Sequence, residues 1–98
     1  MPYFIETYDK PDHYWLRLQE RPAHLDFLAL HADSLLACGA KLSDDESTAS
    51  GGIYVVDVED RGAAAAFIAN DPFYKAGLFA DVHIARWRKA YLDGTCYL

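Results

Sequence analysis

The sequence predicts an α+β domain whose elements follow the order β-α-β-β-α-β. Three observations support this prediction: aromatic and β-branched runs recur along the chain, helix-forming segments lie between them, and turn residues separate the segments. The chain has 98 residues, enough to bury one hydrophobic core, so we expect one domain over residues 1–98. A hydrophobic share of 52% with 24% charged residues is usual for globular proteins and argues against intrinsic disorder.

The first third of the chain is expected to contain a strand and a helix. Aromatic and β-branched residues predict a strand over Tyr3–Tyr8, which ends at the turn residues 9–12. The segment Tyr14–Leu18 is apolar but short, and the residue before Pro22 is disfavoured in a helix, so we expect a loop or a single helical turn there. Proline is tolerated at the first helical position, and leucine and alanine recur at helical spacing after it. We place the first helix at Pro22–Ser34.

Two strands are predicted in the middle of the chain. The first covers Leu36–Leu42, where Gly39 is compatible with a bulge. An acidic connection over residues 43–52 ends in a Ser-Gly-Gly run and leads into Ile53–Val58, which has the clearest strand pattern of the sequence.

The last third supplies a second helix and a fourth strand. Asp60 is placed to cap a helix that runs through an alanine-rich segment to about Asn70, and alternation over Asp81–Trp87 predicts the fourth strand. The segment Tyr91–Leu98 receives no assignment. The resulting order is that of the ferredoxin-like arrangement, a four-stranded antiparallel sheet with two helices on one face.

The face of the sheet away from the helices also carries large side chains. Alternation sets Tyr3 and Ile5 against Phe4 and Tyr8, so neither face of the first strand is polar. An apolar sheet face with a polar rim is typical of an interface, and we therefore expect a homodimer formed by sheet stacking.

Charge and cysteine content restrict the partners and the compartment. Nine Lys and Arg residues against fifteen Asp and Glu residues give a net charge of −6, which argues against binding to nucleic acid or to an anionic membrane. Cys38 and Cys96 lie far apart without a CxxC spacing, which indicates free thiols in a reducing compartment rather than a zinc site. No segment approaches the ~20 apolar residues of a membrane-spanning helix, and the first residues lack the features of a signal peptide. We expect a soluble, cytoplasmic protein.

Two segments at helix ends carry residues suited to proton transfer. His24 lies where the predicted first helix begins, and Asp71 lies just after the second helix. The fold can bring these segments together, and an imidazole held by a carboxylate is a usable general base or acid near neutral pH.

The chain resembles the YCII-like (YciI-related) family in these same segments. The resemblance rests on Arg21-Pro22-Ala23-His24-Leu25, on Leu36-Ala37-Cys38-Gly39 and on Asn70-Asp71-Pro72-Phe73, and it spans nearly the whole chain. That family has the ferredoxin-like fold of the dimeric α/β barrel superfamily and is thought to use a His and Asp pair as its active site. The resemblance implies those roles for His24 and Asp71. A related member is a dehydrochlorinase acting on a chlorinated hydroxyquinol, a substrate that the motifs do not carry over to this chain.

Other residues are candidates for binding roles. Those expected to contact a substrate are Tyr8, Arg21, Ser50 and Tyr74. A metal site at His24 and His31 is disfavoured, because the rings lie two helical turns apart and no nearby Cys or His completes a ligand set. Asp71 before Pro72 is also a typical helix N-cap, a structural role that does not exclude catalysis.

These observations predict a small enzyme in which His24 moves a proton on a small organic substrate and Asp71 orients the imidazole. Elimination, isomerisation and hydrolysis all fit, and no motif requires a cofactor. The alternative is a non-catalytic dimeric module that binds a small metabolite or a protein, with His24 and Asp71 forming a structural hydrogen bond. A haem- or oxygen-dependent protein is less favoured, because nothing singles out an axial histidine.

Overall fold

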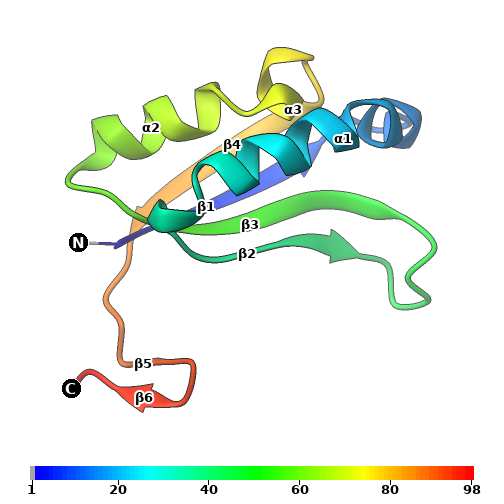
Figure 1. Ribbon diagram of the computed structural model, residues 1–98. Helices are drawn as coiled ribbons and strands as arrows, with labels where there is room; N and C mark the ends of the chain where they lie inside the picture. Colours follow the sequence, from blue (N-terminus) through cyan, green and yellow to red (C-terminus); the bar gives the residue numbers. More distant parts are fainter. Residues whose placement is uncertain (1) are drawn as a thin grey trace.

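The computed structural model describes residues 2–98 and has the predicted α+β architecture (Figure 1). A four-stranded antiparallel sheet carries the helices on one face, and a small C-terminal hairpin lies beyond the last strand. In chain order the elements are β1 (Pro2–Asp9), α1 (Tyr14–Leu30), a 3₁₀ turn η1 (Ala32–Ser34), β2 (Leu35–Leu42), β3 (Ala49–Asp57), α2 (Arg61–Ala69), α3 (Pro72–Lys75), β4 (Phe79–Arg86), β5 (Tyr91–Leu92) and β6 (Thr95–Cys96). Within residues 2–98, none of the helices combines the length and apolar character that crossing a bilayer requires.

The sheet has the strand order β2-β3-β1-β4, so the first and third strands form its centre. Ile5 of β1 lies opposite Tyr54 of β3 on one side and Ile84 of β4 on the other. Directly opposed residues share a face of the sheet, and side chains alternate between faces along each strand. This register places Tyr3, Ile5 and Thr7 toward the helices, where all three are buried.

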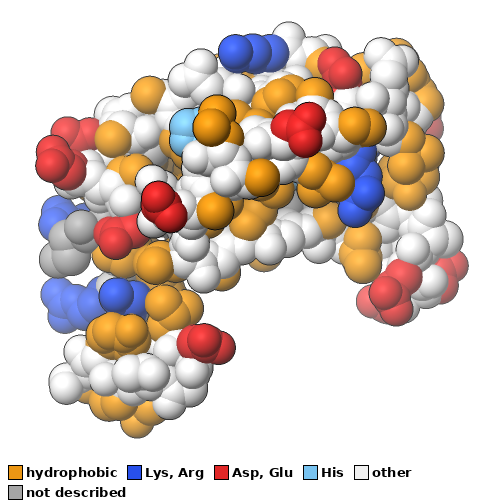
Figure 2. All heavy atoms as spheres, viewed as in Figure 1, with side chains coloured by type: hydrophobic (Ala, Val, Ile, Leu, Met, Phe, Trp, Pro, Cys, Tyr) orange, Lys and Arg blue, Asp and Glu red, His pale blue; other side chains and the backbone are white. Residues whose placement is uncertain are grey.

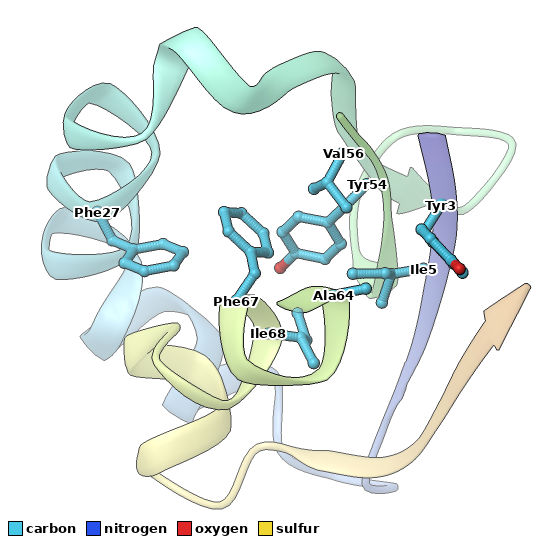
Figure 3. Close-up of a cluster of buried hydrophobic side chains, with 8 residues drawn as sticks. All are labelled: Tyr3, Ile5, Phe27, Tyr54, Val56, Ala64, Phe67 and Ile68. Carbon is cyan, nitrogen blue, oxygen red and sulfur yellow. The ribbon is translucent and has the colours of Figure 1, made fainter. Parts of the chain in front are cut away.

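The hydrophobic core lies between the sheet and the helices (Figure 3). Phe67 of α2 lies between the two layers, with its ring centroid 5.2 Å from that of Phe27 in α1 and 6.1 Å from that of Tyr54 in β3. Val56 and Ile68 are almost completely buried beside them, and each such side chain contributes about 1.5–3 kcal/mol through burial. The core therefore fixes α1 and α2 over the centre of the sheet.

The first helix is longer than the sequence predicts. α1 begins at Tyr14 and continues through Pro22 to Leu30, so the expected loop or single turn before the proline is wrong. An interior proline loses one backbone hydrogen bond and costs about 3 kcal/mol. The first turns offset this cost through tertiary contacts, because Leu16 packs on α3 residues and Arg17 forms an ion pair with Asp9 of β1. The predicted end near Ser34 is reached by the 3₁₀ turn.

Two aspartates begin the helices of the second half. Asp60 caps α2 as predicted, since its carboxylate accepts a hydrogen bond from the N–H of Ala63 at 2.7 Å. Asp71 caps the short helix α3 in the same way, with the N–H of Phe73 donating at 2.9 Å. Pro72 occupies the first position of α3, where its missing N–H costs nothing.

The outer face of the sheet, opposite the helices, is partly apolar. By register it carries Phe4, Ile53 and Val55, together with Glu6, which lies opposite Ile53 and pairs with Lys41 at 3.3 Å. Lys41 also lies 3.5 Å from the Tyr8 ring centroid. The hairpin β5–β6 and the connection between β2 and β3 project on this side and flank the outer face (Figure 2).

Candidate active site

One stripe of α1 forms the first wall of a pocket between this helix and the sheet. Arg17, Arg21, His24 and Leu28 follow one another at spacings of four, three and four residues, which places them on the same side of the helix. The pocket has a volume of about 220 Å³, smaller than the roughly 300–1,000 Å³ typical of pockets for drug-sized ligands. It is suited to one small ring with its substituents.

The second wall comes from β2 and β3 and is built from small residues. Cys38, Ala40 and Gly52 line it, together with the Tyr54 side chain. A side chain at Gly52 would approach the Gly39 carbonyl oxygen to 3.3 Å, so glycine at this position keeps the pocket floor open.

His24 and Asp71, although 47 residues apart in sequence, are hydrogen-bonded in the structure. The Nδ1 atom of His24 lies 2.9 Å from each carboxylate oxygen of Asp71. Both residues are buried, with 9% of His24 and 0% of Asp71 exposed. A buried carboxylate is strongly stabilised by such bonds and strongly destabilised without them, so this pair is held in one geometry.

The Asp71 carboxylate also accepts hydrogen bonds from two other donors. The Tyr54 hydroxyl donates to Oδ2 at 2.8 Å, and the Phe73 N–H donates to Oδ1 at 2.9 Å. An ionised carboxylate only accepts hydrogen bonds, so the His24 Nδ1 atom must carry a proton to take part. The neutral ring is therefore the Nδ1–H tautomer, and its Nε2 atom presents a lone pair.

The Nε2 atom of His24 is open to the pocket. The Nε2 atom has no hydrogen-bond partner among residues 2–98. Every buried side-chain nitrogen and oxygen in that range has a partner, so the Nε2 atom is not itself buried. His24 lines the pocket, so a molecule bound there reaches this nitrogen. The arrangement supplies a base in the neutral ring and an acid after protonation.

Aromatic packing fixes the plane of the imidazole. The Phe73 ring stacks on His24 with centroids 4.0 Å apart and an interplanar angle of 14°, and the Tyr54 ring meets it edge-on. Phe73 is itself held by Arg17, whose Cζ atom lies 4.7 Å from the ring centroid. Because Arg17 is bound to Asp9 by two hydrogen bonds of 2.7 and 3.2 Å, the support reaches back to β1.

Two neutral groups adjoin the pair. Burial, together with the Asp71 charge and hydrogen bond, raises the pKa of Tyr54, so the hydroxyl remains a donor. Cys38 is exposed as a residue, yet desolvation of its thiol within the pocket, followed by the negative charge of Asp71, raises its pKa to about 11. The raised pKa keeps the Cys38 thiol in its neutral form at neutral pH.

The candidate substrate contacts lie in different places. Arg21 lines the pocket three residues before His24. Tyr74 lies on a different groove beside Phe79, and Tyr8 is on the outer face. Ser50 is exposed on β3 and, like Tyr8 and Tyr74, is not among the residues that line the His24 pocket.

Sequence reasoning missed three residues that support the pair: Arg17, Tyr54 and Phe73. Arg17 was hidden because the helix was expected to start at Pro22, and extending the helical spacing back from His24 through Arg21 would have found it. The two aromatic residues have no signal that separates them from ordinary core residues.

The fold and the pocket define a ferredoxin-like protein of the kind that binds or transforms small molecules. The model of the YCII-related domain matches residues 1–88, and the chain belongs to this family. The chain is 35% identical to the protein YciI of Escherichia coli over 98 residues, covering 93% of this chain and 100% of the relative, and the same values hold for YciI of Shigella flexneri.

Solved structures agree with this assignment. The chain is similar to 5-chloro-2-hydroxyhydroquinone dehydrochlorinase from Burkholderia phenoliruptrix, determined in complex with 2,5-dihydroxybenzoquinone, with a TM-score of 0.83 and 29% identity over 90% of this chain and 94% of that one. A protein grouped with the antibiotic biosynthesis monooxygenases, from Bacteroides thetaiotaomicron, shares the fold at a TM-score of 0.57 and 12% identity, covering 95% of this chain and 91% of that one.

Proposed function

We propose that this protein is a cofactor-independent enzyme that uses His24 as a general base and acid on a small organic substrate. The observation that carries the proposal is that the two nitrogens of the His24 imidazole have different surroundings. Nδ1 is bound to a buried carboxylate, while Nε2 opens into the pocket. An oriented imidazole with one free nitrogen typically contributes about 10²–10⁴-fold to a proton-transfer step.

Proton abstraction by Nε2 is the step that the geometry favours. The nitrogen takes a proton from a carbon or oxygen of the substrate, and Asp71 stabilises the imidazolium that forms. In an elimination the C–H electron pair becomes the new double bond, and the leaving group departs with its own electron pair. The imidazolium then returns its proton to water or to the product.

Elimination is the reaction type that the similarity supports best. The related enzyme from Burkholderia phenoliruptrix is a dehydrochlorinase of a chlorinated hydroxyhydroquinone. A pocket of about 220 Å³ with one free base fits a substrate of that size. Isomerisation and hydrolysis use the same proton transfers and are the other candidate reactions. We further propose that residues 1–98 form a single domain and that the protein acts in the cytoplasm.

A specific observation also favours a second candidate, a non-catalytic module that binds a small metabolite or a protein. Asp71 caps α3 and accepts the Tyr54 hydroxyl, so it has a structural role without any reaction. In that case, substitution of His24 or Asp71 lowers the stability of the fold, and the wild-type protein has no catalytic activity.

Deuterium uptake distinguishes the two candidates for any reaction that begins with removal of a proton from carbon. The wild type is incubated in D₂O with small acidic ring compounds and 1,3-diketones, together with 5-chloro-2-hydroxyhydroquinone, and the products are read by NMR and chloride release. We expect His24→Gln to abolish the signal at unchanged fold, while His31→Gln, just after the end of the same helix and outside the pocket, retains it. No uptake or chloride release by the wild type above the His24→Gln level would refute proton abstraction from carbon by His24.

We also propose that two copies associate through the outer faces of their sheets. Phe4, Ile53 and Val55 give this face an apolar patch beside the Glu6–Lys41 ion pair, and no helix covers it within the described chain. Ile53→Arg is expected to convert the dimer to monomer in light scattering. Leu30→Arg makes the same kind of change on the helix side, where Leu30 is 81% exposed, and should leave the dimer intact.

A further inference from the structure

Two guanidinium groups line the pocket, and they differ in whether a carboxylate pairs with them. Arg17 is neutralised by Asp9 at 2.7 Å, and the negative charge of Asp71 lies beneath His24. Arg21 lines the same pocket and is exposed, and it forms no ion pair within residues 2–98. An unpaired guanidinium is thus placed on the wall of a small pocket in a chain whose net charge is −6.

The position of Arg21 relative to the base is fixed by the helix. Residues three apart on a helix have Cβ atoms about 5–6 Å from one another, and both side chains line the pocket. One substituent of a six-membered ring can therefore contact Arg21 while another atom of the same ring meets the His24 Nε2 atom. The planar guanidinium suits an oxygen anion such as a carboxylate or an enolate.

The other walls suit a flat apolar body. Leu25 and Leu28 lie on the helix side, and Ala40 and Gly52 lie on the sheet side. Over the part of the chain that the structure describes, no carboxylate side chain lines the pocket surface. Nothing there repels an anion except the Asp71 charge, which is spread over three hydrogen-bond donors.

We propose that the pocket selects organic anions: a small, flat, acidic ring molecule whose negative oxygen binds Arg21 while its reacting atom faces His24. This inference rests on the proposed function, because it assigns the substrate class of the same site. It makes Arg21 the residue that determines specificity for charge.

The test compares two ring compounds that differ in charge and little in shape, benzoate and benzamide. Binding is followed through the ring ¹⁵N and ¹H signals of His24 in wild type, Arg21→Gln and Arg88→Gln. The last variant removes the same charge at an exposed position outside the pocket lining. We expect benzoate to bind the wild type and Arg88→Gln about tenfold more tightly than benzamide, and to bind Arg21→Gln no better than benzamide.

The outcomes separate this inference from the proposed function. Equal binding of both compounds to the wild type, no binding of either, or an unchanged benzoate preference in Arg21→Gln would overturn the anion assignment. None of these results bears on deuterium uptake, which tests the base alone. Benzoate selectivity without deuterium uptake by the wild type would retain the anion site and refute proton abstraction from carbon by His24.

Discussion

Replacing Asp71 by asparagine tests the centre of the site with a minimal change in shape. Asparagine caps helices as well as aspartate does, so the N–H of Phe73 keeps its partner and α3 remains capped. The charge is lost at the two other bonds, from His24 and from Tyr54. The amide nitrogen is a donor, and where it faces the His24 Nδ1 atom the ring must change to the Nε2–H tautomer.

The expected cost follows from these bonds. A hydrogen bond to a charged group contributes about 1.5–3 kcal/mol and a neutral one about 0.5–1.5 kcal/mol, so exchanging two of them lowers the free energy of unfolding by about 2 kcal/mol. For a domain of this size that is roughly 8–16 °C in the melting temperature. The tautomer change removes the base from the pocket, and the same exchange in a serine-protease triad lowers kcat by about 10⁴-fold.

Thermal unfolding and ¹⁵N NMR of the histidine rings measure both effects. Asp60→Asn is the matched control, because Asp60 also caps a helix but binds only the Ala63 N–H and should unfold as the wild type does. Two results together would refute the reasoning: an Asp71→Asn melting temperature equal to that of Asp60→Asn, and a His24 ring that stays in the Nδ1–H tautomer. They would mean that the carboxylate does not hold the imidazole.

Three further predictions concern other parts of the chain. Iodoacetamide at pH 8 should modify Cys96, whose pKa is lowered by hydrogen bonds from the Leu98 backbone and Tyr91, faster than Cys38 with its pKa of about 11; equal rates measured by mass spectrometry would contradict this. Gly51→Ala should lower the free energy of unfolding in urea by several kcal/mol, since its Cβ would overlap a backbone carbonyl of β1, whereas Gly39→Ala meets nothing within 4 Å and should unfold as the wild type does. Hydrogen bonds from two nearby serines lower the pKa of Asp45 from 3.8 to about 2. The turn should therefore keep these bonds above pH 4 and lose them as the pH falls through 2. An NMR titration midpoint near pH 4 for the Ser47 amide would refute this.

The four strands of the main sheet were predictable from sequence because their pattern is local, whereas the short strands β5 and β6 received no prediction. The start of α1 was not predictable, because the local effect of Pro22 favours a break while the ion pair of Arg17 with Asp9 anchors the turns before the proline to β1. That pair joins two elements, and nothing in the residues between them indicates it.

The candidate site was predictable in part. His24 and Asp71 were identified from two short motifs, and the structure places them 2.9 Å apart. Whether the Nε2 atom of the ring has a free lone pair depends on the tautomer of His24. The tautomer is in turn fixed by the Asp71 carboxylate, which also accepts hydrogen bonds from Tyr54 and Phe73. Their contribution is a matter of three-dimensional hydrogen-bond geometry, which no spacing in the sequence encodes.

The residues around the pocket differ in how much a substitution at each would disturb the fold. His24 and Asp71 are buried and hydrogen-bonded to each other, so substitutions there also lower the stability of the fold. Arg21 and Leu25 line the same pocket but are exposed, Leu25 to 42%, so substitutions there leave the core untouched. Substitution of these exposed lining residues can therefore change which molecule the pocket accepts while the buried His24–Asp71 pair stays intact, so descendants of one ancestor can acquire new ligands at little risk to folding.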